Sequence, residues 1–453
     1  MGRIARLSRL PLGSLRDAAE GAVRRWRGEA PGAVTADLRR RGADRTRSVL
    51  GEAKGGALKA GQLLATVDAL FPADPEATWQ SALATLPADN PAMPFADLEP
   101  TLIDELGQDW RQHFTEFSTA AAAAASLGQV HRARWNDGRD VAVKIQYPGI
   151  AEALRVDIAA VSVFTRFAAL IAPGMALPPL VAEMRDRLSE ELDYRREATV
   201  QRAFVRAYAD DDVIVPKVVH ATERVLVTEW LDGTPFTDLA PRNPADGSPG
   251  QADQSTRDAA ALAYMRFAVS GPERSGWLHT DPHPGNFRWT PDGQLGVLDF
   301  GSALPMPDGM PATFGTLIRL LQEAGSTPSS ARGVGTTGID ADLRDALERE
   351  GFISPGSRVD AVKLRDYLSP FTEPSRHETF TFTPEWLSTH FGRLGDPRNP
   401  DFAVALQLRM PPEHLFTHRV WLGVVGVLCQ LRATVPVRAE VTRWLPGLDA
   451  GDR

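Results

Sequence analysis

Apolar residues recur at helical spacing in several parts of the chain. Residues 50–70 carry them on one face, and in residues 180–192 an apolar side chain returns at every fourth position, which is typical of an amphipathic helix. Residues 98–110 follow the same spacing, and we expect helix to resume at Phe114. The apolar run at 420–428 is far shorter than the roughly 20 residues that a membrane-spanning helix needs, so it predicts a buried core helix.

Strand signals lie between these helices. Residues 129–134 and 140–146 read as two strands, and the Asn136-Asp137-Gly138 sequence between them predicts a hairpin turn. Residues 213–231 predict two further strands joined by a turn, whereas residues 237–256 are rich in Pro, Gly, Ser and Asp and predict a surface loop. Helices and strands together indicate an α+β fold.

The stretch from His279 to Gly301 carries the strongest chemical signal. It reads HTDPHPGNFRWTPDGQLGVLDFG and places Asp281 five residues before Asn286, with Asp299 thirteen residues further on in Asp-Phe-Gly. Asn286 and Asp299 offer the hard oxygen ligands that suit Mg²⁺, and Asp281 is a carboxylate that could accept or orient an acceptor's proton. Joined by a short predicted hairpin, H-x-D-x-x-x-x-N and Asp-Phe-Gly predict a site for phosphoryl transfer.

A loop that covers the nucleotide phosphates is expected immediately before the first of the two hairpin strands, residues 129–134. The pattern G-x-G-x-x-G-x-V, counted back from Val130, would place glycine at 123, 125 and 128, but this chain has Ala123, Ala125 and Gly128. Because alanine resists positive φ, we expect a stiffer cover that holds the triphosphate differently. Lys144, in V-A-V-K fourteen residues beyond Val130, is predicted to reach the α/β-phosphates as a point charge.

Three acidic residues follow on the helix predicted around residue 190. Asp193 and Glu197 are four residues apart and share a face, whereas Glu191 lies about 200° around the helix from Asp193. One point therefore cannot contact all three in a straight helix. Glu197 is the candidate partner for Lys144, and Glu191 and Asp193 are better placed to meet a second cation.

A hinge between two lobes is expected where the strands of residues 213–231 end. The sequence there is Glu229-Trp230-Leu231-Asp232-Gly233. At such a position the backbone groups of Glu229 and Leu231 would be offered to the adenine ring.

Composition and charge narrow the class of protein. The 453 residues are 43% hydrophobic and 24% charged, which is typical of a soluble globular protein. The single cysteine, Cys429, excludes an intramolecular disulfide and a Cys-based zinc site, and we expect it to be buried. His414 and His418 have the i,i+4 spacing of a helical metal pair, but no third ligand accompanies them, so we expect core or capping histidines.

The net charge of −8 is unevenly distributed. Residues 1–50 hold twelve arginines against five acidic residues, a local charge of +7. Such a basic arm could bind an anionic membrane surface, an acidic partner or the acidic remainder of the chain. It could also be a helix whose charged face is simply solvated. We expect a cytoplasmic protein without a transmembrane helix, with peripheral membrane contact as an open alternative.

Together these motifs resemble the UbiB-like family of atypical kinases, also called aarF-domain kinases. The resemblance runs from about residue 50 to 433. It includes V-A-V-K, H-x-D-P-H-P-G-N, Asp-Phe-Gly and three further motifs, which are K-x-G-Q at Lys59 to Gln62, A-A-A-S at Ala123, Ala124, Ala125 and Ser126, and E-x-D at Glu191 to Asp193. The family's proline-plus-aliphatic pair is replaced by Ala121-Ala122, and its asparagine after Glu197 by Val200.

The resemblance implies a two-lobed, protein-kinase-like fold with an N-terminal helical extension. Lys59 and Gln62 of that extension would fold over the active site and meet Glu191 and Asp193. The resemblance also implies ATP binding with Mg²⁺, an ATPase-like activity and a link to isoprenoid-quinone or lipid metabolism. Phosphorylation of other proteins is not expected, because the extension would fill the peptide site.

The expected organisation follows from these motifs. We predict a basic arm at 1–49, a helical extension at 50–115, a kinase-like N-lobe at 116–232 with the alanine-rich loop, and a mainly helical C-lobe at 233–453. We expect ATP as ligand, with a quinone or lipid as a further candidate and no nucleic acid; the oligomeric state is left open.

Two alternative functions stay open. A small-molecule kinase of the aminoglycoside-phosphotransferase kind shares H-x-D-x-x-x-x-N, although the alanine loop and Lys59 to Gln62 argue against it. A nucleotide-gated protein that binds or presents a lipid with negligible turnover is the alternative from another class. A P-loop NTPase is disfavoured because no G-x-x-x-x-G-K-[ST] occurs.

Overall fold

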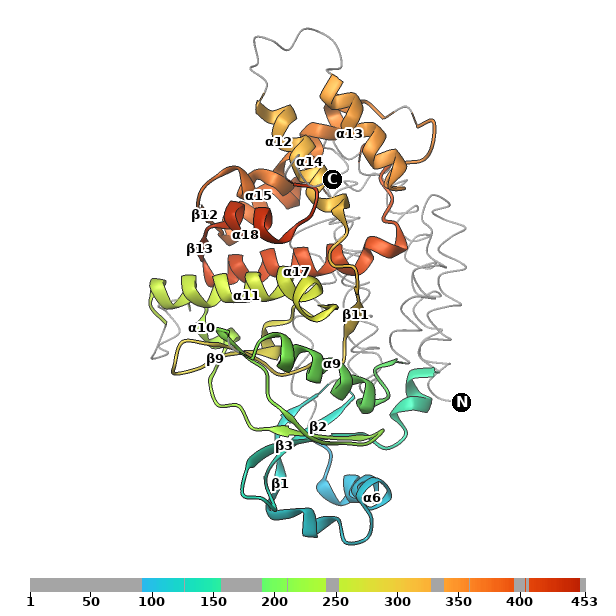
Figure 1. Ribbon diagram of the computed structural model, residues 1–453, viewed down its shortest axis with the longest axis vertical. Helices are drawn as coiled ribbons and strands as arrows, with labels where there is room; N and C mark the ends of the chain where they lie inside the picture. The colour runs from blue at the N-terminus through green and yellow to red at the C-terminus, as the bar shows by residue number, and fades with distance from the viewer. Residues whose placement is uncertain are drawn as a thin grey trace, which may run out of the picture. The chain divides into compact units, whose positions relative to one another are not determined.

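The computed structural model divides the chain into two compact units (Figure 1). Unit 1 takes in residues up to Arg195 together with Val219–Trp230, and unit 2 takes in Arg196–Val218 and Leu231–Arg453. The structure describes residues 92–125, 127–155, 190–209, 211–241, 252–326, 338–357, 359–394, 404 and 407–448. The basic arm, Lys59, Gln62 and Ser126 lie outside the described residues, as does most of the helix predicted at 180–192.

Unit 1 is an antiparallel sheet with a helix packed against it. Its strands follow the order β1-β2-β3-β6-β5. The elements are α6 (Phe95–Leu106), the 3₁₀ turn η1 (Trp110–His113), β1 (Phe114–Ala124), β2 (Gly128–Trp135), β3 (Asp140–Gln146), β5 (Val218–Ala221) and β6 (Val225–Glu229). Leu98 and Leu102 of α6 pack with Val141 and Val143 of β3 in a core where each is 0% exposed. Burial alternates along β3 because α6 covers one face of the sheet.

The β2–β3 hairpin confirms its sequence signal. Gly138 turns with φ of +93°, and its N–H donates to the carbonyl of Trp135 at 2.9 Å. Gly at this position suits the turn because a side chain resists positive φ. The register that follows places Lys144 directly opposite Val130.

The prediction of helix at Phe114 is wrong. Phe114 opens β1, and the alanine run continues that strand, which pairs with β2 through Ala121↔His131 and Ala124↔Gln129. The ring of Phe114 packs edge-on against Phe117 and Trp135. Strand pairing and aromatic packing therefore override the helix propensity of alanine, which is a weak local preference.

Unit 2 is mainly helical. Its helices are α9 (Tyr194–Ala207, from Arg196 on), α10 (Phe236–Leu239), α11 (Gln254–Ser275), α12 (Ala312–Ser326), α13 (Gly338–Arg349), α14 (Ala361–Arg376), α15 (Pro384–Leu394), α17 (Leu415–Leu431) and α18 (Val437–Trp444), with the 3₁₀ turns η3 (Pro284–Asn286) and η5 (Pro412–His414). Its strands are β4 (Val213–Ile214), β7 (Thr234–Pro235), β8 (Trp277–His279), β9 (Phe287–Trp289), β10 (Leu295–Val297), β11 (Ala303–Pro305), β12 (Phe380–Thr381) and β13 (Thr434–Val435).

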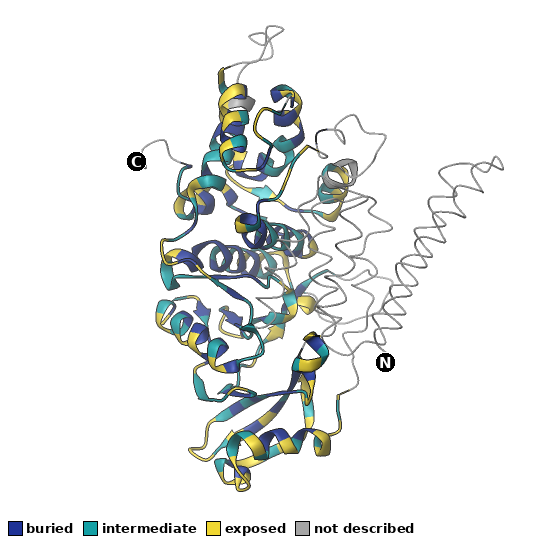
Figure 2. Ribbon diagram, turned by 90° about the vertical axis from the view of Figure 1, so that its right-hand side faces the viewer, coloured by how far each residue is buried: buried dark blue, intermediate teal, exposed yellow. Residues whose placement is uncertain are grey.

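The core of unit 2 lies around α11 and α17. Figure 2 shows helices that are buried along much of their length, and in α17 Val420, Val424 and Leu428 are at most 3% exposed. This confirms the buried core helix predicted at 420–428. Among the described residues, no helix combines the length and apolar character needed to cross a membrane.

Two other predicted elements differ from the structure. The region 213–231 holds three short strands, β4, β5 and β6, where two were predicted. The helix expected to run through residues 191–197 is interrupted, because Glu191 and Leu192 form a turn, Asp193 has no regular secondary structure and α9 begins at Tyr194. The angular argument for a straight helix therefore does not apply to Glu191, Asp193 and Glu197.

Candidate phosphoryl-transfer site

The segment from His279 to Gly301 is brought together by a pair of short strands in unit 2. β8 and β11 are antiparallel, with His279 opposite Ala303, and the N–H of Thr280 donates to the carbonyl of Ser302 at 3.0 Å. Between them, β9 and β10 form the predicted hairpin, where Gly293 turns with φ of +78°. This topology brings the segment after β8 close to Asp-Phe-Gly, although they are about 20 residues apart.

His279 ties the start of the segment to Asp299. It is 4% exposed, and its Nε2 lies 2.6 Å from the carbonyl oxygen of Asp299. Burial lowers the pKa of His279, so the ring is held neutral and its Nε2–H donates this bond. The ring packs edge-on against Phe287 and Phe300. His279 is therefore a structural support of the site.

Asp281 and Asn286 meet through their side chains. Nδ2 of Asn286 donates to Oδ2 of Asp281 at 2.9 Å, and the other carboxylate oxygen, Oδ1, lies 3.3 Å from Nη2 of Arg419 in α17. The structure thus brings together two residues that the sequence singled out. Arg419 was missed, because nothing in the local sequence of an arginine 138 positions away marks it as a partner.

Asp299 and Glu197 lie on either side of Gly301. The N–H of Gly301 donates to Oδ1 of Asp299 at 2.9 Å, and a Cβ atom at Gly301 would lie 3.3 Å from Oε2 of Glu197. Glu197 is 3% exposed on α9, and Phe204 of the same helix packs on Phe300 with ring centroids 5.0 Å apart. α9 therefore presents a buried carboxylate to the Asp-Phe-Gly segment.

The donor set fits Mg²⁺ in chemical character. Asp299 contributes a carboxylate, and Asn286 has an amide oxygen in addition to the nitrogen that binds Asp281. Within the described part of the chain, no group of three or more His, Cys, Asp or Glu side chains could hold a metal. A site with one carboxylate and one amide suits Mg²⁺, which usually keeps several waters and substrate phosphates as ligands.

Lys144 lies at the centre of β3 in unit 1. It is paired with Val130 on one side and with Leu226 of β6 on the other, and its Nζ lies 5.1 Å from the ring centroid of Tyr194. Its predicted pairing with Glu197 joins residues of different units and stays a prediction.

The predicted phosphate cover is shorter than its sequence pattern indicates. Ala123 and Ala124 belong to β1, and the turn closes where the N–H of Ala125 donates to the carbonyl of Gly128 at 2.8 Å. Gly128 is needed for a steric reason, since a Cβ atom there would lie 2.0 Å from the carbonyl oxygen of Ile145. The end of β1 and Gly128 thus lie beside β3, and the role of this segment in covering phosphates stays a prediction.

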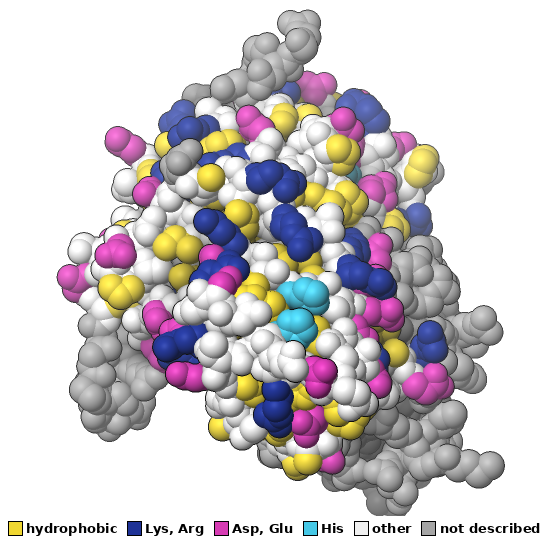
Figure 3. Space-filling model, turned by 60° about the horizontal axis from the view of Figure 1, so that its bottom comes forward, with side chains coloured by type: hydrophobic (Ala, Val, Ile, Leu, Met, Phe, Trp, Pro, Cys, Tyr) yellow, Lys and Arg dark blue, Asp and Glu magenta, His cyan; other side chains and the backbone are white. Residues whose placement is uncertain are grey.

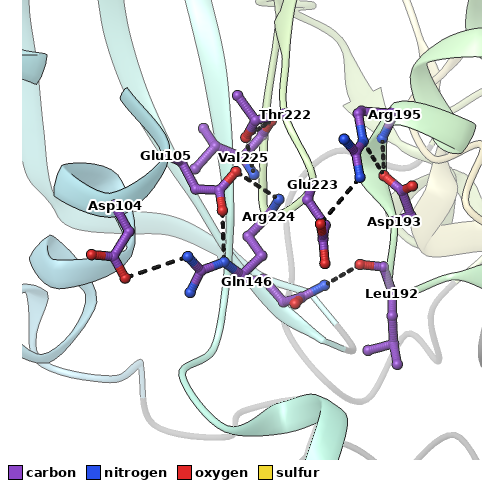
Figure 4. Close-up of polar contacts among 10 residues, drawn as sticks. All are labelled: Asp104, Glu105, Gln146, Leu192, Asp193, Arg195, Thr222, Glu223, Arg224 and Val225. Carbon is purple, nitrogen blue, oxygen red and sulfur yellow. Dashed lines mark hydrogen bonds and ion pairs between the residues drawn. The ribbon is translucent and has the colours of Figure 1, made fainter. Parts of the chain in front are cut away.

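Glu191 and Asp193 lie in the connection that leads into α9. Oδ1 of Asp193 accepts from both the N–H and Nε of Arg195 at 3.0 Å, and Arg195 also pairs with Glu223 at 3.1 Å (Figure 4). Nε2 of Gln146, at the end of β3, donates to the carbonyl of Leu192 at 3.1 Å. Asp193 therefore pairs with a cation within the described residues, namely Arg195. The predicted contact of Glu191 and Asp193 with Lys59 and Gln62 involves residues that the structure does not describe, so it stays a prediction.

The same network reaches α6. Nε of Arg224 pairs with Glu105 at 2.7 Å and its Nη2 with Asp104 at 3.3 Å (Figure 4). Burial by itself would raise the pKa of Glu105, but hydrogen bonds from Thr222 and Arg224 outweigh it and lower the pKa. Arg224 is next to Glu223 in the chain, so α6 and the segment of Asp193 are anchored to the same turn.

The predicted hinge begins with Glu229, the last residue of β6. The N–H of Trp230 donates to the carbonyl of Asp140 at 2.9 Å, and Glu229 lies opposite Val141. Leu231 belongs to unit 2, where a Cβ atom at Gly296 would lie 2.4 Å from its Cδ2. The role of Glu229 and Leu231 in adenine binding stays a prediction.

The structure assigns the remaining candidates to the core. His414 is 6% exposed and stacks on Phe352, and burial lowers the pKa of His418 to about 4. Cys429 is buried, which raises the pKa of its thiol to about 12. The prediction of core histidines and a buried cysteine is confirmed.

One face of the described surface carries side chains of both charges. On the face drawn in Figure 3, Lys and Arg lie among Asp and Glu. Exposed pairs such as Arg139 with Asp137, at 2.6 Å, contribute to this balance. The basic arm at residues 1–50, for which membrane contact is one open alternative, lies outside the described part, and that alternative stays open.

The protein has a kinase-like fold. Unit 1 contributes an antiparallel sheet with Lys144 in one of its inner strands. Unit 2 is mainly helical and carries the segment with Asp281, Asn286 and Asp299. Residues 85–321 match the ABC1 atypical kinase-like domain. The chain therefore belongs to this family of atypical kinases, which confirms its resemblance to UbiB-like proteins.

Individual relatives agree with this assignment. The matched chain in the structure of the Rv3197–erythromycin complex from Mycobacterium tuberculosis has 34% sequence identity to this chain and a TM-score of 0.65. The match covers 92% of this chain and 99% of that one. The mitochondrial atypical kinase COQ8 of Saccharomyces cerevisiae is 27% identical across 92% of this chain and 79% of its own length. The mitochondrial atypical kinase coq-8 of Caenorhabditis elegans is 32% identical, but the match covers 67% of this chain and 40% of that protein.

Proposed function

We propose that this protein binds Mg·ATP and acts as an atypical kinase or ATPase that supports isoprenoid-quinone or lipid metabolism. The observation that carries the proposal is the contact between Asp281 and Asn286, 2.9 Å apart, in a segment tied by His279 to Asp299. Membership of the atypical kinase family supports the same conclusion.

Each residue has a proposed role in this reaction. Asn286 and Asp299 would hold Mg²⁺, which neutralises charge on the phosphates, and Asp281 would orient the acceptor or water. Lys144 would bind the phosphates and pair with Glu197. The turn from Ala123 to Val130 would cover the triphosphate, and the backbone at Glu229 and Leu231 would bind adenine.

The test measures nucleotide binding and turnover separately. Thermal stabilisation by Mg·ATP and release of phosphate are compared for the wild type, Asp299→Asn and, as a matched control in the exposed hairpin turn, Asp292→Asn. We expect binding and release for the wild type and the control, with release lost in Asp299→Asn. Anionic liposomes are added in a second series, because the proposed lipid role predicts faster release in their presence. A wild type that Mg·ATP does not stabilise would contradict the proposal.

A second candidate is a nucleotide-gated binding protein for a bulky, largely apolar ligand. It is favoured by the relative from Mycobacterium tuberculosis, whose structure is a complex with erythromycin. This candidate predicts stabilisation by Mg·ATP and by erythromycin without phosphate release. Release that stops in Asp299→Asn would count against it.

A further inference from the structure

Helix α17 touches the segment of Asp281 at two positions one turn apart. Arg419 and Gly423 have i,i+4 spacing and therefore share a face of the helix. Nη2 of Arg419 lies 3.3 Å from Oδ1 of Asp281, and a Cβ atom at Gly423 would lie 2.1 Å from Cγ of Pro282. One face of α17 thus meets two consecutive residues of the candidate site.

The orientation of the Asp281 carboxylate is defined from two sides. Oδ1 faces Arg419, and Oδ2 accepts from Asn286 at 2.9 Å. The side chains of Arg419 and Asp281 are 15% and 21% exposed, so water screens this pair less than an ordinary surface pair. The pair can therefore fix the carboxylate more firmly than an exposed salt bridge would.

The backbone next to Asp281 is held as well. The hydroxyl of Tyr264, in α11, donates to the carbonyl oxygen of Pro282 at 2.7 Å, and Tyr264 is 0% exposed. The ring of Pro282 lies against α17 where residue 423 lacks a side chain. α11 and α17 together hold Pro282, and Arg419 of α17 reaches the carboxylate of the residue before it.

We propose that Arg419 is a positioning residue, which with the close contact at Gly423 holds Asp281 in the orientation used for phosphoryl transfer. The inference rests on the proposed function, since it assigns Asp281 a part in that reaction. Arg419 acts through Asp281, so its loss is expected to lower kcat while nucleotide binding is kept.

The first test compares Arg419→Met, which keeps the length of the side chain without its charge, with Arg419→Lys. For Arg419→Met we expect kcat for phosphate release to fall by about tenfold to a hundredfold, because a shift of about 1 Å in a reacting group can cost that much. KM for ATP and the thermal shift by Mg·ATP are expected to stay within about twofold, since uniform binding is unaffected. Arg419→Lys is expected to recover part of the loss. An unchanged kcat in Arg419→Met overturns the inference.

A second pair of variants leaves Arg419 in place. Gly423→Ala would push against Pro282, whereas a Cβ atom at Gly426, one turn further along α17, would have no described atom within 4 Å. We expect Gly423→Ala to lower kcat and Gly426→Ala to leave it unchanged. Equal kcat values in the two alanine variants would argue against positioning by α17.

Hydrogen exchange separates failure of this inference from failure of the proposed function. The N–H groups of Thr280, Gly285 and Asn286 each donate to an acceptor within this site. We expect their exchange to accelerate in Arg419→Met, measured without nucleotide, and to stay unchanged in Arg319→Met, which removes an arginine from α12. Unchanged exchange at all three positions overturns the positioning role, whereas a wild type that releases no phosphate overturns the proposed function.

Discussion

Nδ1 of His131 lies 2.9 Å from the carbonyl oxygen of Ser118. The pairing of β1 with β2 shifts its register between Phe117 and Ala121, so this bond holds the irregular part of β1 that precedes the alanine turn. Nε2 of His131 lies 3.0 Å from Nε2 of Gln129, which also donates to the carbonyl of Met93. Because the amide nitrogen donates, His131 accepts at Nε2 and donates from Nδ1, which fixes its neutral tautomer.

The first prediction concerns this bond. His131→Phe should fit among the neighbouring rings of Phe95 and Phe117, but it leaves buried polar groups unpaired. We expect the free energy of unfolding to fall by about 1–3 kcal/mol, measured by urea denaturation. His113→Phe is the matched control, because its half-buried ring stacks on Trp135 and Phe can keep that stack. Equal losses in the two variants would contradict the prediction.

The second prediction concerns the approach of β2 to β3. Gly128→Ala would place a Cβ atom 2.0 Å from the carbonyl oxygen of Ile145, so the strands must separate at the turn. We expect a loss of about 1–3 kcal/mol in the free energy of unfolding, the usual cost of overpacking. Gly338→Ala, where no described atom is within 4 Å, should be close to neutral. A Gly128→Ala variant as stable as the wild type would show that the turn adapts.

The third prediction concerns a buried ion pair between α13 and α14. Nη1 of Arg365 lies 3.0 Å from Oδ1 of Asp340, and the side chains are 10% and 1% exposed. Arg365→Met should cost about 3–5 kcal/mol because it leaves a buried carboxylate without this partner. Urea denaturation of Arg319→Met, which breaks a surface i,i+4 pair, should show a loss of at most about 0.5 kcal/mol.

A double variant tests the cause of that loss. Adding Asp340→Leu to Arg365→Met also removes the buried carboxylate that had faced Arg365, and should recover most of the stability. A double variant no more stable than Arg365→Met would mean that packing, rather than the buried charge, accounts for the effect.

The fourth prediction concerns pH. Burial lowers the pKa of His418 to about 4 in the folded protein, so the unfolded chain binds this proton more tightly. The free energy of unfolding should therefore have its full value above about pH 6.5. As the pH falls from there towards 4, this residue should lower the free energy of unfolding by at most about 1.4 kcal/mol per pH unit. His418→Leu should remove that part of the slope. A slope in His418→Leu that equals the slope of the wild type would contradict the assignment.

The sequence by itself determined the features that depend on neighbouring residues. The β2–β3 hairpin and the hairpin after Asn286 follow from short turns with glycine at positive φ. The spacing of Asp281 and Asn286 placed both in one short segment, where their side chains meet. The buried helix around Val424 followed from a continuous apolar run. Local turn geometry and the apolar pattern were sufficient to predict each of these features.

Only the tertiary structure decided the features that depend on distant pairing. The alanine run became a strand because β2 offered it backbone partners, which outweighed helix propensity. The helix expected through Glu191 broke where Asp193 pairs with Arg195, which in turn pairs with Glu223 in the turn before β6. Arg419 contacts Asp281, although the two residues are 138 positions apart in the sequence. The packing of α17 against Pro282 places the Arg419 side chain beside the carboxylate. No local pattern records such a contact, since burial and packing of the whole unit create it.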